Sequence, residues 1–291
     1  FSENIFIILI IFFILVEFIF VGMHSAFDWQ SIHEIPIIKK DLNPLYLKND
    51  FYTENTINTP KIIYAKFINL INILNVEIDY FLFFCKLLII FLTPIYTFKI
   101  LTNFNNNSKY YLYNNNILTI SLSFVFSLGY FTLIDLDLGG WRSFISWKFV
   151  NPMTISNLIC LFVFHNIQKN DYKNYLNYIL LFIATILHAT TPIFYFILFY
   201  FLLNKHNTKK FIENILLINL NKLLIFAPIL VGSILIIMFF YSPNEQDNKV
   251  YSNIYNYIRH PHHYLVSSYF TIYSLLWISI PLVFLFIFFF N

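Results

Sequence analysis

The sequence RHPHHYL at residues 259–265 places an arginine and three histidines within five positions, namely Arg259, His260, His262 and His263. Polar groups at this density are costly beside a membrane unless they have a function. Pro261 favours an extended backbone at His260, so neighbouring side chains point to opposite sides and one tetrahedral zinc site is not expected. The residue types favour binding of a phosphate by the arginine and one or two of the histidines, with another histidine left for proton transfer. The alternative is a solvated loop.

A second group of chemically capable residues lies in HSAFDWQSIHEIP, residues 24–36, directly after an apolar run. It contains two acids, Asp28 and Glu34, together with His33. An acid held against an apolar wall has a raised pKa and can act as a general base. We therefore take these three residues as candidate catalytic groups. A solvated loop with Trp29 at the membrane interface is the alternative.

The stretch DLDLGGWRSFISWKF, residues 135–149, joins two apolar runs by a short turn. Arg142 carries a permanent charge and a planar fork suited to phosphate or carboxylate. The Asp-x-Asp pattern at its start is typical of metal–nucleotide sites in soluble transferases, and it leaves a divalent metal open as a cofactor. No residue is assigned as a metal ligand. The alternative is an interfacial turn with an Asp–Arg pair.

The stretch HATTP, residues 188–192, interrupts an apolar region that extends from 175 to 203. Helix breaks at membrane depth are tolerated where they line a cavity, which makes His188 a candidate substrate-binding residue. The alternative is a turn that this histidine caps. The broken region is interpreted as two short passes, and one kinked helix remains the other interpretation.

The composition is that of a membrane protein. The chain has 291 residues, of which 58% are hydrophobic and 11% charged, whereas soluble domains carry about 25% charged residues. The net charge of +3 is too small to predict a nucleic-acid surface. Cys85 and Cys160 lie in apolar runs and are expected to be buried hydrophobes. We predict an all-α, polytopic helical bundle with about seven or eight apolar segments.

A membrane span needs about 20 apolar residues. Besides the broken region, the candidate spans are Ile5–Val21, Phe81–Ile100, Ile117–Ile134, Met153–Ile167, Leu223–Tyr241 and Phe270 to Asn291. With a cytoplasmic N-terminus, the short inner loops hold the lysines at 99, 109, 169, 173, 205, 209, 210 and 222, as the positive-inside rule requires. The sequence begins without Met and stops within an apolar run, so both ends are expected to be truncated.

This topology gives four extracytoplasmic segments: 22–80, 135–152, 188–192 and 242–268. Six of the eight histidines fall in them, which supports a site on that face. Within 22–80 a helix is expected at about 60–74, with Thr59 as its N-cap. Its apolar residues at 63, 67, 70, 71 and 74 follow the helical period and predict an interfacial helix. The Asn-rich stretch 103–116 is expected to be an inner loop.

The long first outer loop with an acid at its start resembles the GT-C class of integral-membrane glycosyltransferases. The run KKDLNPLYLKNDFY (39–52) is similar to a D-P-x-L-Y-x-x-D-like run of large bacterial envelope proteins, through Asn43, Pro44, Leu45, Tyr46 and Asp50. RHPHHYL resembles a signature of bacterial polytopic proteins of this general kind. The resemblance implies a lipid-phosphate-linked sugar donor and an outward-facing site. The family's catalytic acid then maps onto Asp28, with Glu34 as its rival, and the phosphate clamp onto Arg142 or Arg259. Asn43 stands at the expected acid, and FDWQSIHE lacks the family's paired acids.

The expected function is therefore a GT-C-like glycosyltransferase of the bacterial inner membrane, which assembles an envelope glycan from a polyprenyl-phosphate sugar donor. Asp28 would deprotonate the acceptor, while Arg259, His262 and Arg142 would stabilise the departing lipid phosphate. A transporter or flippase-like protein with its substrate site at His188 is the first alternative. A non-catalytic membrane subunit of a larger assembly is the second. The expected partners are the bilayer and the lipid donor, with no nucleic acid.

Overall fold

The chain divides into two compact units, one formed by Phe1–Tyr130 with Phe144–Tyr241 and the other by Phe131–Ser143 with Ser242–Asn291. The computed structural model describes residues 7–8, 11–12, 31–50, 53–54, 59–71, 75–107, 150–169, 174–193, 195 and 224–240. All of these residues belong to the first unit, so the helices and contacts described are those within this unit. These residues form helices and loops and contain no strand. The predicted all-α class is therefore confirmed for them.

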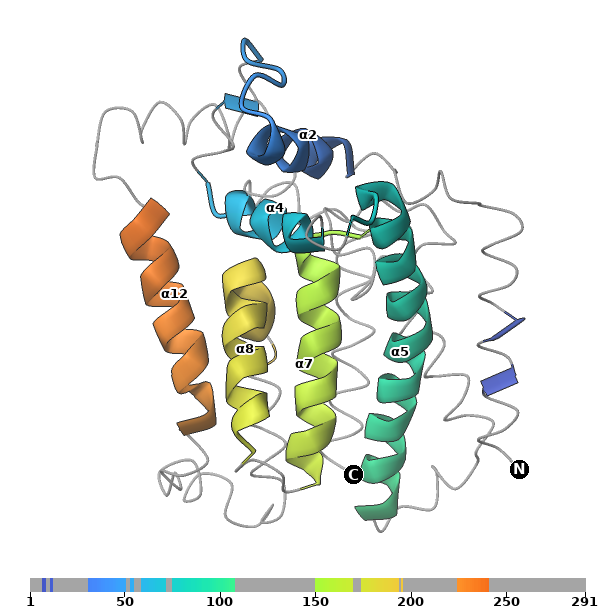
Figure 1. Cartoon of the computed structure of the whole chain (residues 1–291). Coiled ribbons are helices and arrows are strands. Elements are labelled where there is room, and N and C mark those ends of the chain that lie inside the picture. The colour runs from blue at the N-terminus through green and yellow to red at the C-terminus, as the bar shows by residue number, and fades with distance from the viewer. Residues whose placement is uncertain are drawn as a thin grey trace, which may run out of the picture. The chain divides into compact units, whose positions relative to one another are not determined.

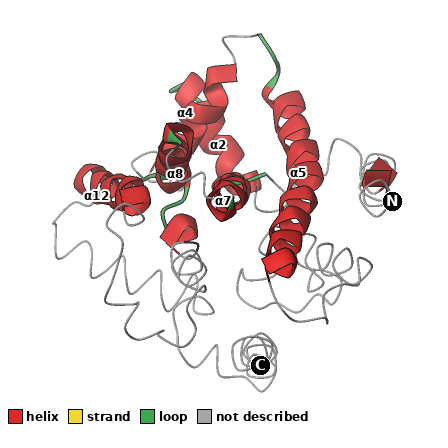
Figure 2. Ribbon diagram, turned by 90° about the horizontal axis from the view of Figure 1, so that it is seen from below, coloured by secondary structure: helices red, strands yellow, loops and turns green. Residues whose placement is uncertain are grey.

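Four helices lie side by side in a row (Figures 1 and 2). They are α5 (Ile78–Asn107), α7 (Pro152–Gln168), α8 (Tyr175–Leu187) and α12 (Ala227–Phe240), the last preceded by the short 3-10 helix η6 (Leu224–Phe226). α7 packs against both α5 and α8, and α8 also packs against α12. Because the long helices are rich in apolar residues all round, they can bury one side against each other and leave another apolar side exposed.

Side-chain contacts give the relative directions of the three central helices. Asn103 and Gln168, near the ends of α5 and α7, are joined by a hydrogen bond, so these two helices run parallel. The Ser156 hydroxyl, near the start of α7, donates to the Ala184 carbonyl near the end of α8. α8 therefore runs antiparallel to both. These directions are the ones that the predicted topology requires of the three helices.

Two shorter helices lie across the end of the row at which α5 and α7 begin and α8 ends (Figure 1). They are α2 (Ser31–Leu42) and α4 (Lys61–Asn69), which pack against each other, and α4 also contacts α8. The Tyr64 hydroxyl of α4 donates to the Val150 carbonyl, just before α7, at 3.2 Å. We call this end of the row the α2–α4 end and the other the opposite end.

One helix was predicted in this outer segment, at about 60–74, and α2 is an additional helix. Its Ile37 and Ile38 are buried in the core. The helix expected at about 60–74 is observed as α4, and it buries Tyr64, Ala65 and Ile68. Phe67 is 37% exposed and Leu70 is 60% exposed. Both belong to the apolar stripe that was predicted to lie at the membrane–water boundary, and that location stays a prediction.

The bounds of the central helices follow from recognisable end signals. Asn151 forms a capping box with Thr154, whose backbone N–H donates to the Asn151 side chain at 2.8 Å, and Pro152 follows at the first turn. α7 thus closely matches the predicted span 153–167. α5 continues to Asn107, so the expectation of a loop from 103 was wrong for residues 103–107. The helical hydrogen-bond ladder outweighs the low helix propensity of asparagine there.

Within the described part of the chain, one helix is long and apolar enough to cross a bilayer by itself, at Ile78–Ile100. Tyr175–Leu187 and Leu224–Phe240 are shorter apolar helices. The latter lies within the expected span 223–241, one residue shorter at each end. It exposes Leu230, Met238 and Phe239. The predicted spans Ile117–Ile134 and Phe270 onward lie outside the described residues, as does Ile5–Val21 apart from helical residues at 7–8 and 11–12.

Candidate functional site

Two of the residues predicted to do chemistry have described side chains, Glu34 and His188. Both lie at the α2–α4 end, since Glu34 belongs to α2 and His188 ends α8. The other predicted residues fall outside the description, namely Asp28, Arg142, Arg259, His260, His262, His263 and the side chain of His33. Their assignments stay predictions.

Glu34 lies in the first turn of α2, where the partial positive charge of the helix N-terminus favours an acid. Its side chain packs toward α4 and the residue is only 9% exposed. One carboxylate oxygen, Oε1, lies 3.5 Å from Nζ of Lys61, the first residue of α4. The other oxygen, Oε2, is buried and has no hydrogen-bond partner among the described residues. A buried polar atom without a partner is rare and calls for an explanation.

Burial raises the pKa of the Glu34 carboxyl above its usual value, and the Lys61 ammonium and a backbone hydrogen bond offset this only in part. The pKa of Tyr64 is raised well above its usual value, first by burial and then by the nearby Glu34 and Cys85. Tyr64 therefore stays protonated, and its hydroxyl donates a hydrogen bond to the Val150 carbonyl. We call Glu34, Lys61 and Tyr64 the Glu34 cluster. Its acid is the one predicted as the rival of Asp28.

His188 is the C-cap of α8, and its backbone N–H donates to the Ala184 carbonyl at 3.0 Å. Its ring Nδ1 lies 2.8 Å from the Thr191 hydroxyl and 3.2 Å from the Thr190 hydroxyl. These contacts orient the imidazole within the turn, as the capping alternative predicts. They occupy Nδ1, so chemistry by this histidine would have to use Nε2.

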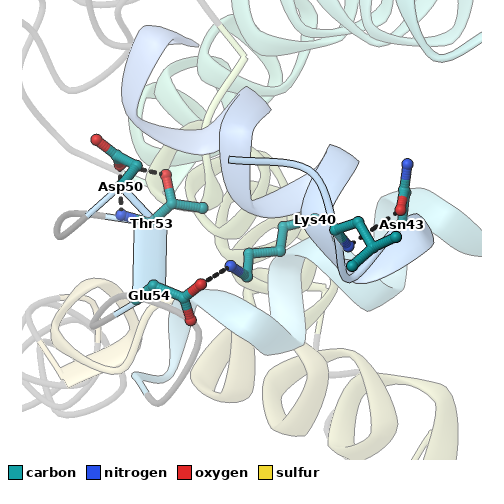
Figure 3. A network of polar contacts seen from close by, with 6 residues as sticks. Lys40, Asn43, Asp50, Thr53 and Glu54 are labelled. Carbon is teal, nitrogen blue, oxygen red and sulfur yellow. Dashed lines mark hydrogen bonds and ion pairs between the residues drawn. The ribbon is translucent and has the colours of Figure 1, made fainter. Parts of the chain in front are cut away.

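The Asn43–Asp50 run has a local structural role (Figure 3). The Asn43 side chain accepts from the Leu45 N–H at 3.0 Å, and Asp50 accepts from both the backbone and the hydroxyl of Thr53. The Thr53 hydrogen bonds also lower the pKa of the exposed Asp50 carboxyl. An ion pair between Lys40 and Glu54 closes the segment. These residue types fit a turn that is fixed by side-chain capping.

Sequence reasoning missed two basic residues. Lys61 was recognised only as part of a helix, because its contact with Glu34 joins positions 27 residues apart, which no local pattern predicts. Lys86 was passed over within an apolar run, although it is the only charged residue between Asp79 and Lys99. It is 1% exposed on α5. An isolated charge in a candidate span was a usable signal.

The opposite end holds a second polar group, which we call the Asn103 cluster: Asn103, His165, Gln168 and Tyr96. The Asn103 amide lies 3.4 Å from Nδ1 of His165 and donates to the Gln168 side chain at 3.4 Å. The Tyr96 ring lies 5.9 Å from the His165 ring. The members bond one another across α5 and α7, which is a packing role.

In the described ranges, no three His, Cys, Asp or Glu residues are grouped closely enough to hold a metal ion. No protein-family model, curated protein or solved structure matches the chain.

Proposed function

We propose that the chain is a polytopic integral-membrane transferase of GT-C-like type, which moves a sugar from a lipid-phosphate-linked donor to an acceptor hydroxyl. The apolar composition and the exposed apolar faces of α8 and α12 support placement in a bilayer. The lysine distribution supports an extracytoplasmic location of the α2–α4 end. In a bacterial cell this would be the outer side of the inner membrane, where envelope glycans are assembled.

The observation that carries the proposal is the Glu34 carboxylate, buried at this end with an oxygen, Oε2, for which the described residues supply no partner. A carboxylate with a raised pKa is suited to take a proton at the working pH. In the proposed reaction, the acceptor oxygen attacks the anomeric carbon while its proton passes to Glu34. The bond from that carbon to the phosphate oxygen breaks, and its electron pair leaves with the lipid phosphate.

The test uses the full chain, purified in detergent and supplied with a panel of polyprenyl-phosphate sugars and acceptor alcohols. The measured product is released polyprenyl phosphate. Glu34→Gln should lower the rate roughly 100- to 10,000-fold, the usual contribution of a general base. Glu77→Gln is the matched control, since Glu77 is exposed just before α5.

Equal rates for wild type and Glu34→Gln would remove Glu34 from the mechanism. Asp28→Asn would then be tested for the same loss. Rates unaffected by either change would overturn the general-base mechanism, and no release from any donor would overturn the transferase.

The second candidate function is a transporter or flippase, and Lys86 is the observation that favours it. A lysine that is 1% exposed within the candidate span is expensive unless it serves a pathway or an ion pair. Transport of a lipid-linked sugar across proteoliposomes that is abolished by Lys86→Met, with no product released, would favour this function over the transferase.

A further inference from the structure

The two members of the ion pair in the Glu34 cluster differ in exposure. The Glu34 side chain is 11% exposed and that of Lys61 is 38% exposed. Their 3.5 Å separation is longer than the roughly 2.7–2.9 Å of a strong charge-assisted hydrogen bond. Lys61 is therefore the member of the pair that is more exposed to an anion in solution.

Besides burial, Lys61 influences whether the Glu34 carboxyl is ionised. Burial disfavours the ionised carboxylate, and the ammonium beside it is the largest influence that offsets this cost. Among the described residues, the other titratable groups near this site are Tyr64 on α4 and Cys85 on α5, close to Tyr64. Tyr64 stays protonated. Of the groups in the cluster, Glu34 is thus the one whose protonation responds to a change at Lys61.

We propose that Lys61 binds the anionic phosphodiester of the substrate, and that this binding makes the Glu34 carboxylate a stronger base. This inference rests on the proposed function, because it identifies the ligand as the phosphodiester that links sugar to lipid. When the phosphodiester neutralises the ammonium, the carboxylate loses its counter-charge in a desolvated position. Its affinity for a proton therefore rises. At low pH the carboxyl takes up a proton when the donor binds, whereas at higher pH it stays ionised and is a stronger base toward the acceptor.

The probe is methyl farnesyl phosphate, a phosphodiester whose single charge does not change near neutral pH. The full chain is studied in dodecyl maltoside, a detergent without phosphate. Calorimetric titration at pH 6 in two buffers with different ionisation enthalpies gives both the affinity and the number of protons taken up. Wild type should take up a measurable fraction of a proton per ligand bound, and Glu34→Gln should bind the probe with no uptake.

Lys61→Met should weaken binding at least about tenfold, which is the loss expected for one hydrogen bond to a charged group. Lys66→Met, an exposed lysine on the same helix, is the matched control and should bind as wild type does. Dimethyl phosphate separates the two sources of the anion. Much weaker binding of dimethyl phosphate identifies a lipid site, and equal binding identifies a site for any phosphodiester; both support the assignment of Lys61.

Unchanged affinity in Lys61→Met overturns the binding role, and proton uptake that persists in Glu34→Gln overturns the coupling. The outcome is separable from that of the proposed function. A protein that binds the probe with proton uptake but transfers no sugar would refute the transferase alone. An active transferase in which Lys61→Met binds the probe normally would refute only this inference.

Discussion

The two ends of the helical row use polar residues in different ways. In the Asn103 cluster, amide and imidazole groups on parallel helices bond one another. In the Glu34 cluster, an acid is buried against a partly exposed lysine, with an oxygen, Oε2, that no described residue satisfies. Neutral groups that satisfy each other can stabilise packing, whereas a buried charge with an incomplete set of partners costs stability. The polar groups of the opposite end thus serve packing, whereas the α2–α4 end keeps a buried acid that the proposed reaction would use.

The largest expected effect is on the rate, and it should occur at one end only. Glu34→Gln is expected to slow sugar transfer roughly 100- to 10,000-fold. His165→Leu removes the contact with Asn103 at the opposite end and should leave the rate per folded molecule within about twofold, because surface or packing changes act mainly on stability. Initial rates normalised to the folded fraction provide the measurement. A comparable loss of rate in both variants would break the comparison.

The second prediction concerns the free energy of unfolding. Most substitutions lower it, whereas Glu34→Gln is expected to raise it. The folded pKa of Glu34 is raised, so its protonated form is the one that folding favours. Its contribution to stability is present at low pH and is lost as the pH rises through the folded pKa. Glu34→Gln should therefore stabilise the protein at pH 7, because it removes a buried charge and keeps the shape of the side chain; a change of about 1 kcal/mol, the usual size for one substitution, is expected.

Chemical denaturation of the full chain in detergent, at pH 7 and again at pH 4, measures this effect. The advantage of Glu34→Gln should shrink at the lower pH, where the wild-type carboxyl is protonated. Glu77→Gln should show neither effect, since Glu77 is exposed. A destabilised Glu34→Gln at pH 7 would mean that attraction to Lys61 outweighs the cost of burial, and the two ends would then be alike.

Local features of the sequence predicted the central helices well. The apolar run 153–167 and the cap Asn151–Pro152 suffice to locate α7, because helix ends depend on neighbouring residues. Glu34 was also identified, as an acid beside an apolar run. Its charged neighbour was not, because the approach of Lys61 to Glu34 is set by the packing of α2 on α4.

The smallest expected effects come from one substitution made at both ends. Asn151, at the α2–α4 end, caps α7 with a reciprocal capping box that is buried. Asn174, at the opposite end, caps α8 with an exposed hydrogen bond to the Leu176 N–H at 3.0 Å. Asn151→Ala should lower the free energy of unfolding by about 1 kcal/mol, and Asn174→Ala by about 0.5 kcal/mol, the low end for a lost cap.

Neither change should alter the transfer rate per folded molecule, because capping residues act on helix stability. Denaturation midpoints and initial rates of the two variants, measured on the same preparations, check this. The result sharpens the comparison, since Asn151 is a polar residue of the α2–α4 end with a structural role. A large loss of rate in Asn151→Ala alone would show that the start of α7 also takes part in the reaction. This is the place where the Val150 carbonyl accepts a hydrogen bond from the Tyr64 hydroxyl.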